Sequence, residues 1–148
     1  MFRRTTKTEI DSLVGISARI DGDLRFTGGL RVDGEVHGDV LGGDSTENVL
    51  IVSEHARIEG NVRCATLIVD GYIAGNVFAT ELLELQPKGR IIGNVHYKTL
   101  EMHSGATVAG TLTHQEGGEP EFHMVIQPPS YPKGSEARLA PTVYNDPN

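Results

Sequence analysis

The chain has 148 residues and a formal net charge of −7, with 18 glycines and a hydrophobic content of 38%. This length suits a single domain, and the acidic balance argues against a general nucleic-acid-binding protein, which needs a basic surface to neutralise phosphates. So much glycine is atypical of a helical bundle or a coiled coil and favours a fold of short strands and corners.

Residues 1–9 come first and carry no repeat. Met1, Phe2, Arg3 and Arg4 place one aromatic ring beside two cations. A segment of this kind binds weakly to the anionic inner face of a membrane, and many copies on one polymer would add up through avidity. The alternative is an idle, flexible N-terminal tail. We expect a cytoplasmic protein, because signal-peptide features are missing and no apolar run approaches the roughly 18 residues that span a bilayer.

Residues 10–114 contain an internal repeat in which a glycine is followed by a small polar residue and then an aliphatic one. Short-period self-similarity indicates structural units that bury their apolar faces only by stacking on one another. The six copies are Gly22-Asp23-Leu24, Gly38-Asp39-Val40, Gly60-Asn61-Val62, Gly75-Asn76-Val77, Gly93-Asn94-Val95 and Gly110-Thr111-Leu112.

Within one repeat, apolar and polar residues alternate around the turn signals, as in Leu30, Val32, Val36 and Val40. Alternation of period two predicts very short strands with one inward face, and glycine beside Asp or Asn supplies the positive φ of tight corners. Three such sides close into one rung. We therefore predict an all-β, single-stranded parallel β-helix of about six triangular rungs, in which rungs one and three are two residues longer than rungs two and four.

Two segments depart from the repeat. Residues 42–47 form an insertion between rungs two and three, which we expect to loop out from a corner. Beyond residue 114 lie six of the seven prolines, which oppose continued strand pairing. The predicted organisation is a flexible tail over 1–9, a β-helix core over 10–114, and a Pro-rich flexible tail over 115–148.

Catalytic, cofactor and metal motifs are not found in the sequence. The aspartates lack the spacing of calcium-binding nonapeptides, and no histidine is paired with a cysteine or carboxylate at metal-ligand spacing. Phosphate-binding loops and dinucleotide fingerprints are also missing. Cys64, the single cysteine, is interpreted as a small residue near a strand end. The sequence therefore predicts no catalytic residue, no cofactor and no metal.

The ends of a solenoid expose unpaired strand edges and an apolar cross-section unless a capping element covers them. No amphipathic helix is available here as a cap. We therefore predict end-to-end self-assembly, with contacts through Leu13, Val14, Ile16 and Ile20 at one end and Leu100, Met102, Val108 and Leu112 at the other.

The stretch from about Ile10 to Leu112 resembles the bactofilin family of bacterial cytoskeletal proteins. The residues that carry the resemblance are the segment Val32–Val40, its echo at 69–77, and Ile91-Ile92-Gly93-Asn94-Val95. The resemblance implies a right-handed β-helix, non-polar filaments that form without nucleotide, and a membrane-targeting role for Met1, Phe2, Arg3 and Arg4. It also implies a polymer contact through an aromatic residue beyond the last rung, for which Phe122 is the candidate.

The function that we expect is structural. Filaments at the inner face of the cytoplasmic membrane would act as a scaffold for cell shape or for envelope enzymes, with the chain itself, the membrane leaflet and envelope proteins as partners, and no nucleic acid. One alternative is an acyltransferase of the hexapeptide-repeat type, which the unequal rung lengths disfavour. A second alternative is a solenoid adaptor that never polymerises.

Overall fold

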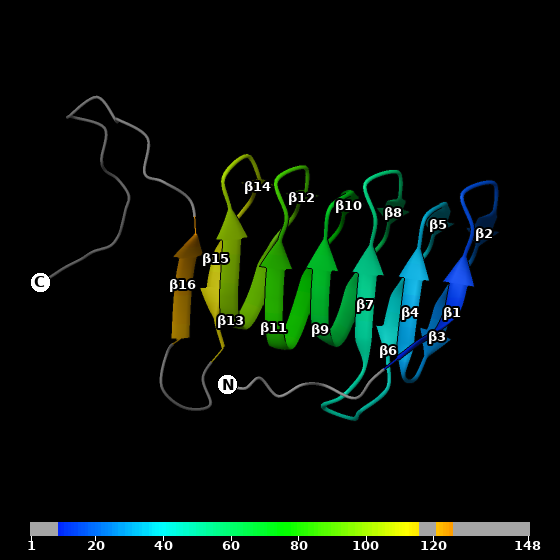
Figure 1. Cartoon of the computed structure of the whole chain (residues 1–148), viewed down its shortest axis with the longest axis horizontal. Coiled ribbons are helices and arrows are strands. Elements are labelled where there is room, and N and C mark those ends of the chain that lie inside the picture. Colours follow the sequence, from blue (N-terminus) through cyan, green and yellow to red (C-terminus); the bar gives the residue numbers. More distant parts are fainter. Residues whose placement is uncertain (1–8, 116–120, 126–148) are drawn as a thin grey trace, which may run out of the picture.

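A computed structural model describes residues 9–115 and 121–125, which form sixteen strands. The strands coil into a solenoid with three faces (Figure 1), and every pairing between them is parallel. In the described part of the chain, no helix is long and apolar enough to cross a membrane. The sequence-based prediction of an all-β parallel solenoid of about six rungs is confirmed. The predicted membrane-targeting residues 1–4 lie outside the described residues.

Each rung contributes one strand to each of the three faces. The first face comprises β1 (Ile10–Val14), β4 (Gly29–Val32), β7 (Val49–Val52), the later parts of β9 (Val62–Val69), β11 (Val77–Leu85) and β13 (Val95–His103), and β16 (Glu121–Val125). The second face comprises β2 (Arg19–Asp21), β5 (Glu35–His37), β8 (Arg57–Glu59), β10 (Tyr72–Ala74), β12 (Arg90–Ile92) and β14 (Thr107–Ala109). The third comprises β3 (Leu24–Phe26), β6 (Val40–Gly42), the earlier parts of β9, β11 and β13, and β15 (Leu112–His114).

Inward-facing residues of successive rungs stack in columns of like side chains. On the second face, Ile20 is followed by Val36, Ile58, Ile73, Ile91 and Val108 in strict register. The four inner members are almost completely buried, whereas the two terminal members are only partly buried. Alternation of inward and outward residues along each short strand produces this core, as the sequence pattern predicts.

The repeated glycines also form a column, in which each one lies against the glycine before it. A Cβ added to Gly38, Gly60, Gly75, Gly93 or Gly110 would lie 1.9–2.1 Å from the carbonyl oxygen of the preceding column glycine. No side chain fits at such a distance, so close backbone approach requires glycine at all five positions, and a positive φ also favours glycine at all of them except Gly60. Sequence reasoning gave only the conformational part of this explanation.

The polar residue after each column glycine joins neighbouring rungs. The backbone N–H of Asn61 donates to Asp39 Oδ1, and that of Asn76 donates to Asn61 Oδ1, each at 2.9 Å. Asp39 and Asn94 donate in the same way to the rung before them, and the ladder ends where Thr111 Oγ1 donates to Asn94 Oδ1. These side chains therefore satisfy corner N–H groups from one rung to the next, in addition to being solvated.

The unequal rung lengths arise at the corner between the first and second faces. Four residues, 15–18, connect β1 to β2, whereas two residues, 33–34, connect β4 to β5. The paired strands on both sides remain in register, so the extra residues do not disturb the columns. The same four-residue and two-residue corners follow β7 and β9.

The insertion after β6 is a loop that is held from within by Asn48. This residue is buried, and its Nδ2 donates to the carbonyl oxygens of Gly43 and Ser45 at 2.9 and 3.0 Å. Its Oδ1 accepts a hydrogen bond from the backbone N–H of Ala65 at 2.7 Å. A structural loop is observed here, as expected, but the anchoring role of Asn48 was not foreseen.

Strand β16 is the main departure from the expected organisation. It lies within the segment predicted to be a flexible tail, yet it pairs in parallel with β13. The alternating sequence Glu121-Phe122-His123-Met124-Val125 is compatible with a strand, and it places Phe122 in register with Leu100. The first face therefore continues one strand beyond the other two (Figure 1).

Candidate assembly surfaces at the ends of the stack

At the N-terminal end, β1, β2 and β3 each pair with another strand on one side only. Their other edges therefore carry backbone groups that no described strand satisfies. Ile20 and Leu24, the first members of their columns, are only partly buried. This end combines free strand edges with an apolar surface, which is the combination that promotes strand addition.

The four predicted contact residues at this end occupy different positions. Ile20 ends an inward column, and Val14 is already buried. Leu13 is 62% exposed and lies in register with Arg31, on the outward side of β1. Ile16 is exposed in the corner that leads to β2. Leu13 and Ile16 therefore lie at the rim of this end rather than in its centre.

At the C-terminal end, the free edges belong to β14, β15 and β16. Val108 ends the column on the second face, and Leu112 ends a column on the third face and is 43% exposed. Leu100 is completely buried, because β16 pairs beside it, and Met102 is partly buried. On the first face, β16 is therefore the last described strand of the stack, with Phe122 in register with Leu100.

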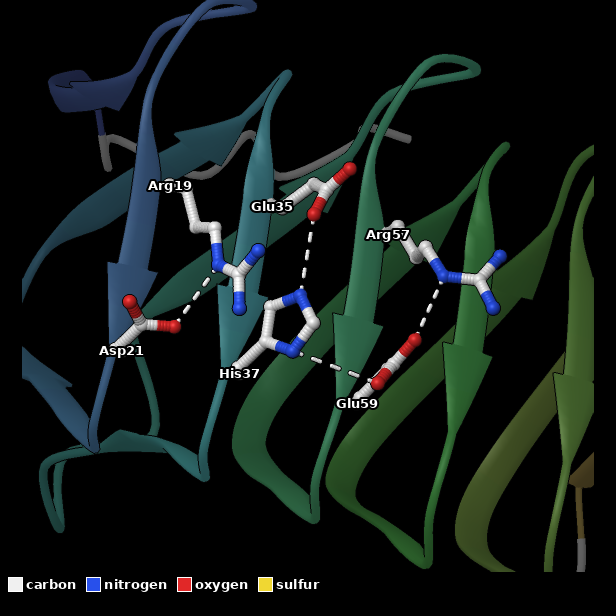
Figure 2. Close-up of polar contacts among 6 residues, drawn as sticks. All are labelled: Arg19, Asp21, Glu35, His37, Arg57 and Glu59. Carbon is white, nitrogen blue, oxygen red and sulfur yellow. Dashed lines mark hydrogen bonds and ion pairs between the residues drawn. The ribbon is translucent and has the colours of Figure 1, made fainter.

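Charged side chains cover the second face near the N-terminal end (Figure 2). Arg19 Nε lies 2.9 Å from Asp21 Oδ1, and Arg57 Nε lies 2.7 Å from Glu59 Oε2. Hydrogen bonding to Asp21 raises the pKa of Arg19, and hydrogen bonding to Arg57 lowers the pKa of Glu59. These pairs are exposed to solvent, so each contributes little to the stability of the fold.

His37 lies between two carboxylates in the same group. Its Nε2 is 3.1 Å from Glu35 Oε1 and its Nδ1 is 3.5 Å from Glu59 Oε1. Figure 2 shows these side chains projecting from β5 and β8, beside the Arg19–Asp21 pair of β2. The result is an alternation of charge along the stack that reaches its free end at β2.

The C-terminal end differs in charge. Strands β14 and β15 have the sequences Thr-Val-Ala and Leu-Thr-His, which contain no Asp, Glu, Lys or Arg. On the second face, the two ends of the stack are therefore chemically distinct, because β2 carries a cation and an anion and β14 carries neither.

Cys64 lies inside the stack. It belongs to the core cluster, and burial raises the pKa of its thiol to about 12. A thiol in this environment is neutral at physiological pH and a poor nucleophile or metal ligand. Cys64 is the third residue of β9, which fits the interpretation as a small residue near a strand end, and its place in the core is an addition from the structure.

The sequence analysis did not identify one cluster of polar side chains. Glu84 of β11 is in register with Glu101 of β13, and His103 lies two residues further along β13. One ligand atom from each of the three residues lies within 4.8 Å of the others. The signal was the rung period, which brings a glutamate from one rung beside a Glu-x-His sequence in the next.

The comparisons with known proteins agree with this architecture. A family model described as bactofilin, polymer-forming cytoskeletal, matches residues 12–113. The chain is similar to the bactofilins BacP and BacO of Myxococcus xanthus strain DK1622, with 31% identity over 102 residues and 24% over 111 residues. These matches cover 69% and 75% of this chain, but 41% of BacP and 85% of BacO.

A solved structure is also similar. It is a cryo-EM reconstruction of Thermus thermophilus bactofilin double helical filaments, with a TM-score of 0.65 and 27% identity, and it covers 70% of this chain and 99% of the other. The family model spans the β-helix core from Ser12 in β1 to Thr113 in β15, and β16 lies beyond it. The chain therefore belongs to the bactofilin family of polymer-forming cytoskeletal proteins.

Proposed function

We propose that this protein assembles end to end into filaments through the two open ends of its β-helix. The observation that carries the proposal is the state of the terminal strands. Each has one unpaired edge, and apolar columns end in the partly buried Ile20, Leu24 and Val108 and in the exposed Leu112. Stacking a second molecule on either end would pair these edges and bury Ile20, Leu24, Val108 and Leu112. The double helical filaments of the Thermus thermophilus relative support the proposal.

The charge pattern of β2 supports a non-polar filament, in which like ends meet. Its sequence is Arg19-Ile20-Asp21. If two copies of β2 met antiparallel about a two-fold axis through Ile20, Arg19 of each molecule would oppose Asp21 of the other, and opposite charges across a strand pair are favourable. A head-to-tail joint would instead place these charges against the uncharged β14. We therefore propose N-to-N joints that alternate with C-to-C joints.

This assembly mechanism needs no nucleotide, since the joint consists of strand pairing and apolar contact. We further propose that Met1, Phe2, Arg3 and Arg4 attach the filament to the inner face of the cytoplasmic membrane, where cations and an aromatic side chain are favoured. A filament anchored in this way would act as a non-enzymatic scaffold for cell shape or for envelope proteins. The supporting argument for attachment is the composition of this segment alone.

The test of end-to-end assembly is Leu112→Arg. An unpaired charge buried in a joint costs about 3–5 kcal/mol, which raises the concentration needed for assembly more than 100-fold. Because Leu112 is 43% exposed in the single chain, the arginine side chain can reach solvent and the monomer should fold. Thr113→Arg, which adds the same charge to the outward side of β15, is the matched control.

Assembly is measured without added nucleotide by sedimentation and negative-stain electron microscopy. We expect filaments for the parent protein and for Thr113→Arg, and folded monomers or single-joint dimers for Leu112→Arg. Unchanged filaments of Leu112→Arg would contradict the proposed C-terminal joint. Membrane attachment is tested separately by liposome flotation with and without residues 1–7, and equal flotation of both forms would overturn it.

A further inference from the structure

We propose that Glu84, Glu101 and His103 form a binding site for a divalent transition-metal ion of the Zn²⁺ type. The three side chains project from adjacent strands β11 and β13, and their ligand atoms lie within 4.8 Å of one another. None of the three side chains is fully exposed. Together they offer two carboxylates and one imidazole, a ligand set suited to zinc.

The two carboxylates are placed unfavourably unless a cation lies between them. Glu84 and Glu101 occupy matching register positions on neighbouring parallel strands, and like charges directly opposite each other are destabilising. The two lysine–glutamate ion pairs among the described residues involve Glu54 and Glu81 instead. A bound divalent cation would convert this repulsion into attraction.

His103 supplies an independent observation. Its Nε2 is shielded from solvent and makes no hydrogen bond in the described part of the chain. The nearest carboxylate oxygen, Glu84 Oε2, is 3.4 Å away and does not meet hydrogen-bond geometry, while Gln86 Nε2 donates to that same oxygen at 2.5 Å. An imidazole nitrogen that is shielded from water and makes no hydrogen bond is unfavourable even though the ring itself is 32% exposed, and coordination of a metal would satisfy it.

The distances suit an ion after small side-chain movements. Zinc bonds of about 2.0–2.2 Å in a tetrahedral site place ligand atoms about 3.3 Å apart, so donors separated by up to 4.8 Å need to close by about 1.5 Å. Rotation of the two glutamate side chains can supply this movement, since the strands themselves are already adjacent. Three protein ligands leave the fourth position for water.

The site is tested by titrating ZnCl₂ into the full chain, free of any histidine tag, by isothermal titration calorimetry. His55→Gln is the matched control. His55 Nε2 also lies 3.4 Å from one carboxylate, Glu54, but among the described residues no second carboxylate is grouped with it. We expect one zinc ion per chain with a micromolar Kd, weakened at least tenfold by Glu101→Gln and by His103→Gln and unchanged by His55→Gln. MgCl₂ should not compete.

Circular dichroism verifies that each variant retains the parent β-sheet signal, and zinc should raise the melting temperature of the parent and of His55→Gln more than that of Glu101→Gln. Equal zinc affinity in the parent, Glu101→Gln and His103→Gln would overturn the assignment, as would the absence of saturable binding by the parent. Zinc binding can also be measured when filament assembly is weakened, because the same variants can be compared in the Leu112→Arg background.

Discussion

The glycine column allows a comparison of two alanine substitutions that share a positive φ but differ in how closely the new Cβ approaches the preceding rung. Gly75→Ala and Gly22→Ala both introduce a Cβ where φ is positive, +155° and +134°. At Gly75 the new Cβ would lie 2.0 Å from the carbonyl oxygen of Gly60. At Gly22, the first column member, nothing lies within 4 Å of the same position.

The backbone conformation alone costs about 1–3 kcal/mol for a residue other than glycine, and this is the whole expected loss for Gly22→Ala. At Gly75, the rungs must also separate by about 1 Å, which weakens the flanking hydrogen bonds from Gly60 N to Ala74 O and from Val62 N to Asn76 O. We expect a total loss of about 4–6 kcal/mol for Gly75→Ala, a large part of the 5–15 kcal/mol typical of a domain.

The assay is urea denaturation followed by circular dichroism, carried out in the Leu112→Arg background at a concentration where sedimentation shows only monomers, so that assembly does not contribute. The difference between the two variants isolates close backbone approach from backbone conformation. Losses that agree within about 1 kcal/mol would show that rung contact is not what requires glycine, and would refute the reasoning.

Three further predictions concern single groups. Arg19→Asp or Asp21→Arg alone should raise the critical concentration for filament formation about tenfold in a sedimentation assay, and the double exchange should return it to the parent value. A double variant with the same high critical concentration as the single variants would contradict the antiparallel joint. Asn48→Ala should lower the free energy of unfolding by about 2–4 kcal/mol in urea, because it leaves the buried N–H of Ala65 without an acceptor, whereas a loss below 0.5 kcal/mol would mean that water replaces the side chain. Cys64 should resist iodoacetamide at pH 8 in the native protein and react in urea, since the pKa of its thiol is about 12 and the thiolate becomes abundant only as the pH approaches that value; rapid native labelling would disprove this protection.

The columns and the rung period could be predicted because each depends on local rules. Alternation along Leu30 and Val32 specifies which side chains point inward, and the repeated glycines fix where each face ends. Stacking then follows from the similarity of successive repeats. The same rules located Ile20, Val108 and Leu112 at the ends of the stack.

Other features depended on which residues the stack places side by side. The pairing of β16 with β13 buries Leu100, and a segment beside several prolines gave no sign of that pairing. Leu13 was assigned to an end because it is apolar, although its register with Arg31 places it on the outward side. The grouping of Glu84 with His103 likewise depends on the exact register between neighbouring rungs. The number of residues in each corner changes this register, and composition gives no information about it.

The direction of the hydrogen bonds in this fold has a mechanical consequence. The strands run across the rod and their hydrogen bonds run along it, so tension along the axis loads the ladders of all three faces together. Inside one molecule the covalent chain also crosses every rung boundary, because it winds from each rung into the next. A joint between molecules has strand pairing without that covalent link. In the filament that we propose, overload would therefore sever the polymer between subunits and leave each folded unit whole, ready to rejoin when the tension falls.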